Sequence, residues 1–308
     1  MNTHRNIIAK QLARLWRYIF ETNDSRRLRR QRHDTSDLSV LADIAYIADG
    51  TQEHLLDIYR PANGSDRLPV IVNIHGGGLF ASYKTVNTWF NHECARMGYT
   101  VVSISYRRLP DTTLVHQIED VIAALRFISD QRECYHLDLD RCYLTGDSAG
   151  ALLGLFALAI EHNEALQHAF RITPAGITFR AAAFISIMLD TQRTAPMAFL
   201  GKLVADAEDA GKPYLPYILH PDTLVGQAQL PPVYLVTSAQ DLIREDTLRL
   251  ARLFTSAGVE HRLRDLPKGK RHALVHVFCV QYPTWDESRQ ILQEIDAFFR
   301  DNASAAIR

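Results

Sequence analysis

Two glycine-rich segments contain the residues best suited to nucleophilic chemistry. Ser148 stands at the centre of Gly146-Asp147-Ser148-Ala149-Gly150, and His75-Gly76-Gly77-Gly78 precedes it; each segment ends a β-branched apolar run. The pentapeptide matches G-x-S-x-G, a tight strand-to-helix turn that exposes a serine hydroxyl to a base. Consecutive glycines let backbone N–H groups approach an oxyanion. Together the segments predict acyl transfer through Ser148.

Chance does not readily account for both segments. With glycine and serine each at about 7% of an average protein, G-x-S-x-G arises by accident in roughly one chain in ten of this length. A His-Gly-Gly-Gly run is rarer by about two orders of magnitude. Two unrelated glycine-rich turns are therefore the less favoured interpretation.

Hydrophobic periodicity indicates the elements that must position these segments. Short apolar runs predict buried strands at 70–74, 101–106, 142–145, 183–188 and 233–237. Helical patterns such as 117–129 separate several of them, while 40–47 and 54–59 predict a hairpin joined through Asp49-Gly50. The run 149–160 is too short to span a bilayer and predicts a buried helix. This alternation favours a mostly parallel central sheet with helices on both faces.

Two further segments follow the predicted sheet. The stretch at about 190–231 has helical character, including 196–210, and is long for a connection, so it is either part of a cap over the site or a peripheral insertion. Near the end, Thr284-Trp285-Asp286-Glu287 fits a capping box before a helix over 291–299. Positional candidates for pocket-lining residues, for which a plain core role is equally favoured, are Leu79, Phe80, Met197, Phe199 and Leu200.

From about Leu41 to Phe299 the chain resembles the α/β-hydrolases of the hormone-sensitive-lipase and carboxylesterase group. The resemblance rests mainly on the two glycine-rich segments, with weaker similarity at Leu56–Pro61 and Tyr106-Arg107. It implies an α/β fold of the α/β-hydrolase type with a helical cap. We expect residues 36–308 to form one catalytic domain with a cap-like insertion at about 190–231.

The same resemblance implies a triad in the order serine, acid, histidine. Asp241 is the first acid after the strand 233–237, and we expect Glu245 and Asp246 to belong to the first turn of the next helix. The loop after a strand at about 261–266 holds two histidines. His276 is favoured over His272 because His276-Val277-Phe278 resembles the group's His-x-Phe signature.

Oxyanion donors follow from geometry and the resemblance together. The N–H of Ala149, directly after the nucleophile, is one expected donor, and those of Gly77 and Gly78 are the others, with Gly76 as an alternative. His75 and Asp147 are then interpreted as supports that hold the turns rather than as proton carriers.

The N-terminal residues 1–35 form an amphipathic, basic segment. Ile7, Ile8, Leu12, Leu15, Trp16, Ile19 and Phe20 recur at helical spacing, and a run of arginines follows at 26–32. The favoured interpretation is a helix that packs its apolar stripe on the body and solvates its basic face. A part of the cap comes next, and binding to a membrane surface or a polyanion is the third alternative.

Composition bounds the partners. The 308 residues are 47% hydrophobic, with 34 Lys plus Arg against 35 Asp plus Glu, so overall charge gives no reason to expect nucleic acid as a partner. We expect a cytoplasmic protein, because no secretory signal is apparent and four cysteines without C-x-x-C spacing suit buried free thiols. No stable membrane insertion, metal or cofactor is expected, and the oligomeric state stays open, a homodimer included.

These observations favour a serine carboxylic-ester hydrolase whose substrate is a small-molecule ester with a short- to medium-chain acyl group, through an acyl-enzyme. An amidase, formamide hydrolase or small-peptide hydrolase with the same triad is the first alternative. A catalytically inert ligand-binding protein on a hydrolase scaffold is the second.

Overall fold

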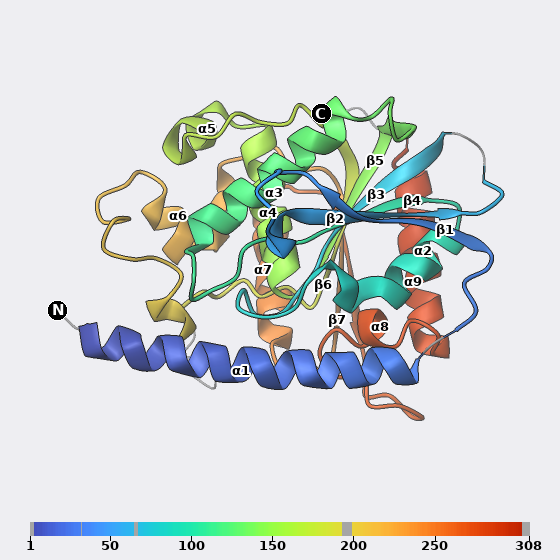
Figure 1. Ribbon diagram of the computed structural model, residues 1–308, viewed down its shortest axis with the longest axis horizontal. Helices are drawn as coiled ribbons and strands as arrows, with labels where there is room; N and C mark the ends of the chain where they lie inside the picture. Colours follow the sequence, from blue (N-terminus) through green and yellow to red (C-terminus); the bar gives the residue numbers. More distant parts are fainter. Residues whose placement is uncertain (1–2, 32, 65–66, 193–198, 304–308) are drawn as a thin grey trace.

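A twisted sheet crosses the centre of the molecule, and the helices lie on both sides of it (Figure 1). The computed structural model describes residues 3–31, 33–64, 67–192 and 199–303. Within these residues the sheet has eight strands, in the order β1-β2-β4-β3-β5-β6-β7-β8. The strands are β1 Leu38–Ala45, β2 Leu55–Pro61, β3 Leu68–Ile74, β4 Thr100–Ile104, β5 Leu137–Asp147, β6 Phe179–Ile185, β7 Val233–Ser238 and β8 His261–Leu266.

The sheet is antiparallel only at its first edge. Strand β2 pairs antiparallel with both β1 and β4, whereas every pair from β4 to β8 along the sheet is parallel. The carboxyl ends of these parallel strands therefore share one edge, where the loops after β3, β5, β7 and β8 meet. Ligands of open α/β sheets bind at this edge.

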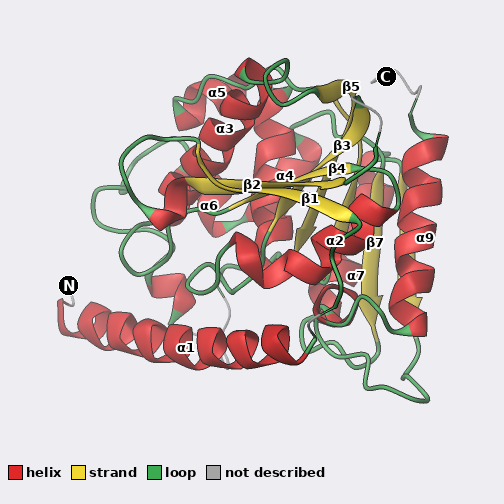
Figure 2. Ribbon diagram, turned by 45° about the vertical axis from the view of Figure 1, so that its right-hand side comes forward, coloured by secondary structure: helices red, strands yellow, loops and turns green. Residues whose placement is uncertain are grey.

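Helices cover both faces of the sheet (Figure 2). The α-helices are α1 Thr3–Arg30, α2 Thr88–Arg96, α3 Leu114–Asp130, α4 Ala149–Glu161, α5 Glu164–Phe170, α6 Leu215–Leu219, α7 Arg244–Ala257, α8 Phe278–Gln281 and α9 Asp286–Asp301. Short 3₁₀ turns occupy η1 Gln52–His54, η2 Lys84–Asn87, η3 Leu200–Lys202 and η4 Pro221–Gly226.

Side-chain alternation along the central strands creates two cores. In β3, Val70 and Val72 belong to the core shared with α3, α4 and α7, whereas Ile71 between them belongs to the core shared with α2 and α9. Successive side chains of a strand point to opposite faces, so a strand buried on both faces is apolar at every position. This explains why the central strands appear in the sequence as continuous apolar runs.

The predicted fold class is confirmed, with two corrections to the bounds and start of its elements. Strand β6 covers 179–185 instead of 183–188, because Ser186 has φ 53° and leaves the extended conformation. The predicted capping box is wrong: α9 begins at Asp286 with Trp285 as N-cap and no side-chain cap bond. The box would need Thr284 as the N-cap, but the helix starts one residue later. Asp286 and Glu287 instead place negative charge in the first turn of α9.

The insertion before β7 is less helical than predicted. Residues 193–198, with Met197, lie outside the described part, and over 199–210 the only helix there is the 3₁₀ turn η3. Asp209 accepts the N–H of Asp206 at 2.7 Å, and Asp206 accepts that of Glu208 at 2.8 Å. Such local side-chain bonds compete with helix formation.

Helix α1 runs across the carboxyl edge of the sheet, outside the other layers (Figure 1). Its predicted orientation is wrong: Ile8, Leu12 and Leu15 are exposed, and Ala9 and Ala13 face the body instead. Small residues allow the helix backbone to approach closely. The apolar stripe of this helix is therefore left facing solvent.

Charged side chains on the inner face of α1 hold it in place. Arg17 donates to the carbonyl of Phe80 at 2.7 Å and to that of Leu109, and Arg27 donates to the carbonyl of Gln281 at 3.0 Å. The two arginines thus provide hydrogen-bond donors for carbonyl groups of the loops. A purely apolar inner face could not do so. These bonds explain why a pattern based on hydrophobicity misplaced the buried face.

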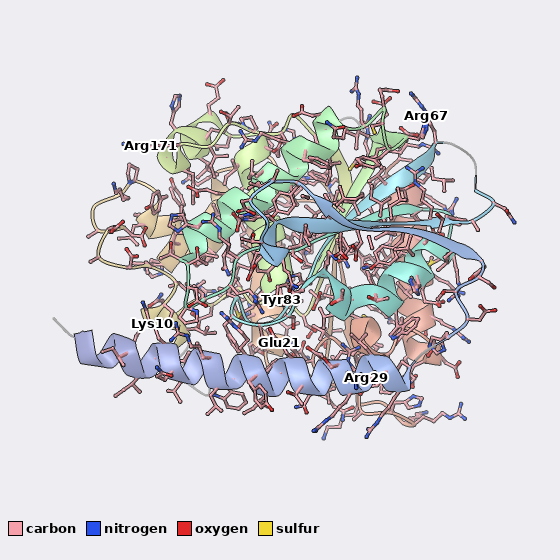
Figure 3. The ribbon with its side chains drawn as sticks, viewed as in Figure 1. Lys10, Glu21, Arg29, Arg67, Tyr83 and Arg171 are labelled. Atoms are coloured by element: carbon pink, nitrogen blue, oxygen red, sulfur yellow. The ribbon has the colours of Figure 1, made fainter. Side chains whose placement is uncertain are left out.

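A second set of contacts lies near the middle of α1, where Glu21 is on the side toward Tyr83 (Figure 3). Arg108 is buried, donates to Glu21 and to the hydroxyl of Tyr83, and lies 3.7 Å from the centre of the Tyr83 ring. Because Glu21 lies in α1, Tyr83 follows β3 and Arg108 follows β4, the cluster joins α1 to the loops after these two strands.

Replacing Gly150 by alanine is expected to lower the free energy of unfolding by about 1–3 kcal/mol, because overpacking forces the backbone to move. A Cβ on Gly150 would lie 2.0 Å from the carbonyl oxygen of Ile74. Urea unfolding measures the loss. Gly226 is the matched control, since a Cβ there meets nothing within 4 Å, and Gly226→Ala should change stability by less than about 0.5 kcal/mol. Equal losses in both variants would contradict this account.

Candidate active site

Ser148 occupies a sharp turn between β5 and α4. Its φ is 52° and its ψ is −116°, a backbone conformation that residues other than glycine rarely adopt. Backbone bonds hold it there: Ser148 N–H donates to Ile185 at 2.9 Å, and Met188 N–H donates to the carbonyl of Ser148 at 3.1 Å. The turn thus aims the serine out of the sheet at the amino end of α4, where the helix dipole favours negative charge.

The structure brings Ser148, His276 and Asp241 together in one hydrogen-bonded chain. His276 Nε2 lies 3.0 Å from Ser148 Oγ, and His276 Nδ1 lies 2.8 Å from Asp241 Oδ1. The three residues follow β5, β7 and β8, whose carboxyl ends share an edge. With a proton on Nδ1, Nε2 is free to accept the serine proton.

The environment of Asp241 favours its charged form. Burial alone would raise the pKa of this carboxyl, but the hydrogen bond and charge of His276 and further bonds from Ser186 and the Ile243 N–H lower the pKa below its ordinary value. Thr237 also donates to Asp241 Oδ2 at 3.0 Å. Asp241 is therefore positioned to stay ionised and to stabilise a protonated His276.

The alternative residues lie elsewhere. His272 stacks on Trp285 with ring centres 4.0 Å apart and its Nδ1 is 3.4 Å from Glu287, so it belongs to the packing of the start of α9. Glu245 and Asp246 are in the first turn of α7, as expected. Asp246 has a further role that the sequence did not suggest: its Oδ2 accepts the N–H groups that follow β6, including that of Leu189 at 2.8 Å.

The expected oxyanion donors differ in availability. Gly76 N–H donates to Asp147 Oδ1 at 3.1 Å, so this alternative donor already has an acceptor. Within the described residues, the N–H groups of Gly77 and Gly78 donate to no protein acceptor, and both glycines have positive φ and line the same pocket as Ser148. Ala149 is the first residue of α4 and lacks an intrahelical acceptor.

Asp147 and His75 are buried supports of the glycine segment. Asp147 Oδ1 also accepts from Asn87 at 2.7 Å, and burial raises the pKa of Asp147 to about 6. His75 stacks on Tyr106 with ring centres 4.4 Å apart, and burial lowers the pKa of His75 to about 3. Sequence reasoning missed Asn87, since no pattern singles out one asparagine in a distant turn.

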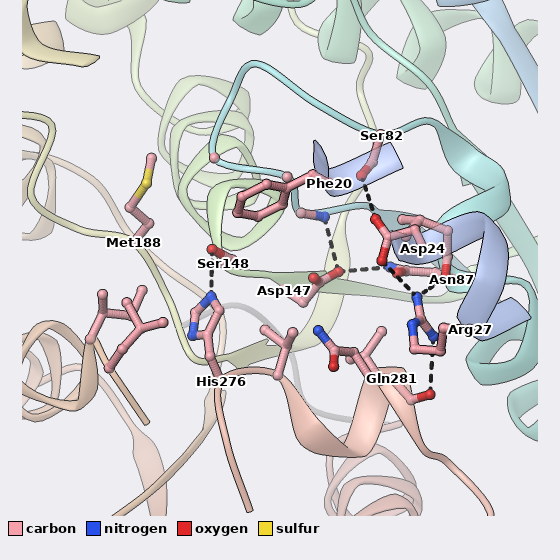
Figure 4. A pocket seen from close by; sticks show the side chains of 18 residues that line it. Phe20, Asp24, Arg27, Ser82, Asn87, Asp147, Ser148, Met188, His276 and Gln281 are labelled. Carbon is pink, nitrogen blue, oxygen red and sulfur yellow. Dashed lines mark hydrogen bonds and ion pairs between the residues drawn. The ribbon is translucent and has the colours of Figure 1, made fainter. Parts of the chain in front are cut away.

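An apolar pocket opens beside Ser148 and His276 (Figure 4). The empty space along it, open solvent included, is about 860 Å³. Its lining residues are Phe20, Asp24, Arg27, Gly76, Gly77, Gly78, Ser82, Val86, Asn87, Asp147, Ser148, Met188, Leu242, Ile243, His276, Val277, Val280 and Gln281. Helix α1 thus contributes three residues to the lining. The sequence analysis had favoured a helix that only packs on the body, with a part of the cap as the second interpretation.

The described positional candidates for the pocket have the core role that was their other interpretation. Leu79, Phe80, Phe199 and Leu200 are buried in the core and are absent from the lining, and Met197 lies outside the described residues. The described part of the insertion, 199–231, contributes no lining residue either; its turns contact α1, α4 and α7.

Two kinds of feature are absent from the described residues. No group of three or more histidine, cysteine, aspartate or glutamate side chains there is arranged to hold a metal ion. No helix there is long and apolar enough to cross a membrane. The four cysteines are free thiols, of which Cys134 is exposed and Cys94, Cys142 and Cys279 are buried.

The model of a protein family described as the alpha/beta hydrolase fold matches residues 71–278, from the third strand to the start of α8. This range holds Ser148, Asp241 and His276. The chain belongs to the α/β-hydrolase family. Proteins named as esterases are among its matches in sequence and in structure.

Esterase LipI of Mycobacterium tuberculosis is 28% identical over 218 residues, which cover 66% of this chain and 65% of LipI. The isoprenylcysteine alpha-carbonyl methylesterase ICME of Arabidopsis thaliana is 29% identical over 112 residues, 36% of this chain and 26% of that protein. The chain therefore spans less than two thirds of these relatives. A crystal structure of esterase B from Lactobacillus rhamnosis has a TM-score of 0.90 at 25% identity, covering 97% of this chain and 96% of esterase B.

The raised pKa of Asp147 predicts a pH-dependent stability. Because the carboxyl titrates at 3.8 when unperturbed and at about 6 in the fold, the folded state binds more protons in this window, and stability falls as pH rises through it. Between these pH values, the free energy of unfolding of the wild type should fall by up to about 3 kcal/mol relative to that of Asp147→Asn. Urea unfolding at a series of pH values measures this. The exposed Asp140→Asn is the matched control, and a difference from Asp147→Asn that stays constant with pH would refute the prediction.

Proposed function

We propose that this protein is a serine carboxylic-ester hydrolase that acts on short- to medium-chain acyl esters through an acyl-enzyme. The observation that carries the proposal is the hydrogen-bonded chain from Asp241 through His276 to Ser148 Oγ, which opens into an apolar pocket. Relatives named as esterases and a family match over most of the chain support the same chemistry.

In the first half of the reaction, Ser148 Oγ attacks the ester carbonyl while His276 Nε2 takes its proton. The negative oxygen of the tetrahedral intermediate lies toward the N–H groups of Gly77, Gly78 and Ala149. His276 then gives the proton to the leaving alcohol as the bond to the acyl group breaks. Asp241 keeps His276 in the required tautomer and stabilises its cation.

The second half repeats these roles with water. His276 takes a proton from water, the hydroxide attacks the acyl-enzyme, and collapse of the second intermediate returns the proton to Ser148. The acid leaves, and the enzyme is restored.

The pocket supports an apolar acyl or alcohol portion of moderate size. Phe20, Met188 and Ile243 contribute its apolar lining from three separate elements. Esterase B has also been crystallised with a C4-C4 tributyrin phosphonate as inhibitor, in a structure with a TM-score of 0.88 to this chain, 26% identity, and coverage of 98% of this chain and 97% of that one. We infer by analogy that short acyl chains fit here.

We further propose that residues 1–35 contribute α1 as the cap of a catalytic domain formed by 36–308. The support is its inner face, where Phe20, Asp24 and Arg27 border the pocket. The insertion at about 190–231 would then brace α1 through η3 rather than cover the site.

Ser148→Ala is expected to lower kcat for p-nitrophenyl butyrate by about 10⁴–10⁶-fold, because the nucleophile is lost while binding is retained. Initial rates on wild type and variant give the ratio. His272→Ala is the control and should keep near-wild-type kcat, since His272 stacks on Trp285 away from Ser148. Wild-type turnover by Ser148→Ala would refute the proposal.

Matched esters and amides distinguish the reaction class. A higher kcat/KM on the amide would favour the amidase, formamide hydrolase or small-peptide hydrolase alternative. Absence of turnover on all substrates, with binding of a small ester in the pocket, would favour the inert ligand-binding alternative.

A further inference from the structure

The outer face of α1 carries a stripe of exposed apolar side chains. Ile8, Leu12, Leu15 and Ile19 are between 37% and 62% exposed. Their spacing of four, three and four residues places them on one side of the helix. Trp16 and Tyr18 flank the stripe and are 36% and 71% exposed. A continuous apolar face of this kind on a solvent-exposed surface marks an interaction site.

The same face continues into a group of arginines. Arg26 and Arg30 follow the stripe at helical spacing, and Arg29 lies beside them near the end of the helix (Figure 3). All three are exposed, and every exposed charged side chain among the described side chains of α1 is basic. The acidic residues Glu21 and Asp24 are directed inward, to Arg108 and Ser82.

A basic loop extends the charged region. In Figures 1 and 2 the loop after β8 projects past the C-terminal half of α1, away from the sheet. Lys268 and Lys270 in this loop are exposed. The apolar stripe therefore borders a cationic region contributed by two separate segments.

We propose that this outer face of α1 docks the protein reversibly on a lipid surface that carries anionic headgroups. Helices that lie in such an interface combine an apolar face, aromatic residues and clustered arginine or lysine. A second copy of the chain could cover Leu12 and Leu15, but it would present no exposed acidic side chain of α1 to the arginines. An anionic lipid surface matches the apolar and the cationic part together.

Docking in this orientation would bring the site close to lipid-dissolved esters. A groove between α1 and Gln281-Tyr282 shares Phe20, Asp24 and Arg27 with the pocket beside Ser148. An apolar ester could pass from the surface to the pocket along this groove. This delivery rests on the proposed function, whereas the lipid binding itself does not.

Co-sedimentation with large unilamellar vesicles tests the proposal, using Ser148→Ala protein so that hydrolysis plays no part. Binding is expected to vesicles of phosphatidylcholine with about one-third phosphatidylglycerol, and much weaker binding to phosphatidylcholine alone. Leu12→Glu with Leu15→Glu should weaken binding more than about tenfold, because apolar burial is lost. Replacing Arg26, Arg29 and Arg30 by glutamine should weaken it about a hundredfold.

A matched control separates the face from general charge effects. Val40→Glu with Leu41→Glu removes two exposed apolar side chains and adds the same two charges on the edge strand β1. It should bind vesicles like the parent protein, with circular dichroism melts confirming that all variants are folded. Failure of the parent to sediment with anionic vesicles, or an equal loss in the control, would overturn the proposal. A dimer in sedimentation velocity that only Leu12→Glu with Leu15→Glu dissociates, without vesicle binding, would instead identify a second copy as the occupant.

Discussion

The turn at Ser148 is the constraint on which the rest of the structure depends. A side-chain-bearing residue with φ 52° costs on the order of 1–3 kcal/mol, and it persists only where its surroundings determine it. Hydrogen bonds to Ile185 and Met188 fix the turn from the neighbouring strand. Gly150 lets α4 approach β3 so closely that a Cβ would overlap the carbonyl of Ile74.

Each neighbour of this turn connects it to another part of the site. Asp147, adjacent to Ser148, accepts the N–H of Gly76 and so connects the glycine segment to the turn at Ser148. Asn87 completes this contact from the turn before α2. On the other side, the parallel strands β7 and β8 deliver Asp241 and His276 to the same edge. The side chains of the proposed triad are thus placed by sheet geometry, and α1 forms the outermost layer over them.

Much of this could be predicted from the sequence because the signals are local. Continuous apolar runs identified the buried strands, and G-x-S-x-G identified a turn whose geometry requires glycine. The choice of His276 over His272 came from resemblance alone, since both lie in one loop. The contacts of Asn87 and Asp246 could not be predicted. Each joins two segments that are distant in the sequence, and no repeating pattern of residues indicates such a contact.

The orientation of α1 shows a different limit of sequence reasoning. Periodicity ranked its apolar stripe as the buried face, yet Arg17 and Arg27 face inward because loop carbonyls there need donors. Hydrophobic patterns describe which residues avoid water in general. They do not contain the hydrogen-bonding needs of a surface formed by other parts of the chain.

The central claim is that this turn makes Ser148 the activated nucleophile, and covalent labelling tests it most directly. The protein would be treated with a p-nitrophenyl alkylphosphonate, and intact mass and peptide mapping would count and locate the adducts. The account predicts one adduct, on Ser148, with labelling slowed strongly in His276→Ala and absent in Ser148→Ala. An adduct on another residue, or undiminished labelling of Ser148→Ala, would contradict it.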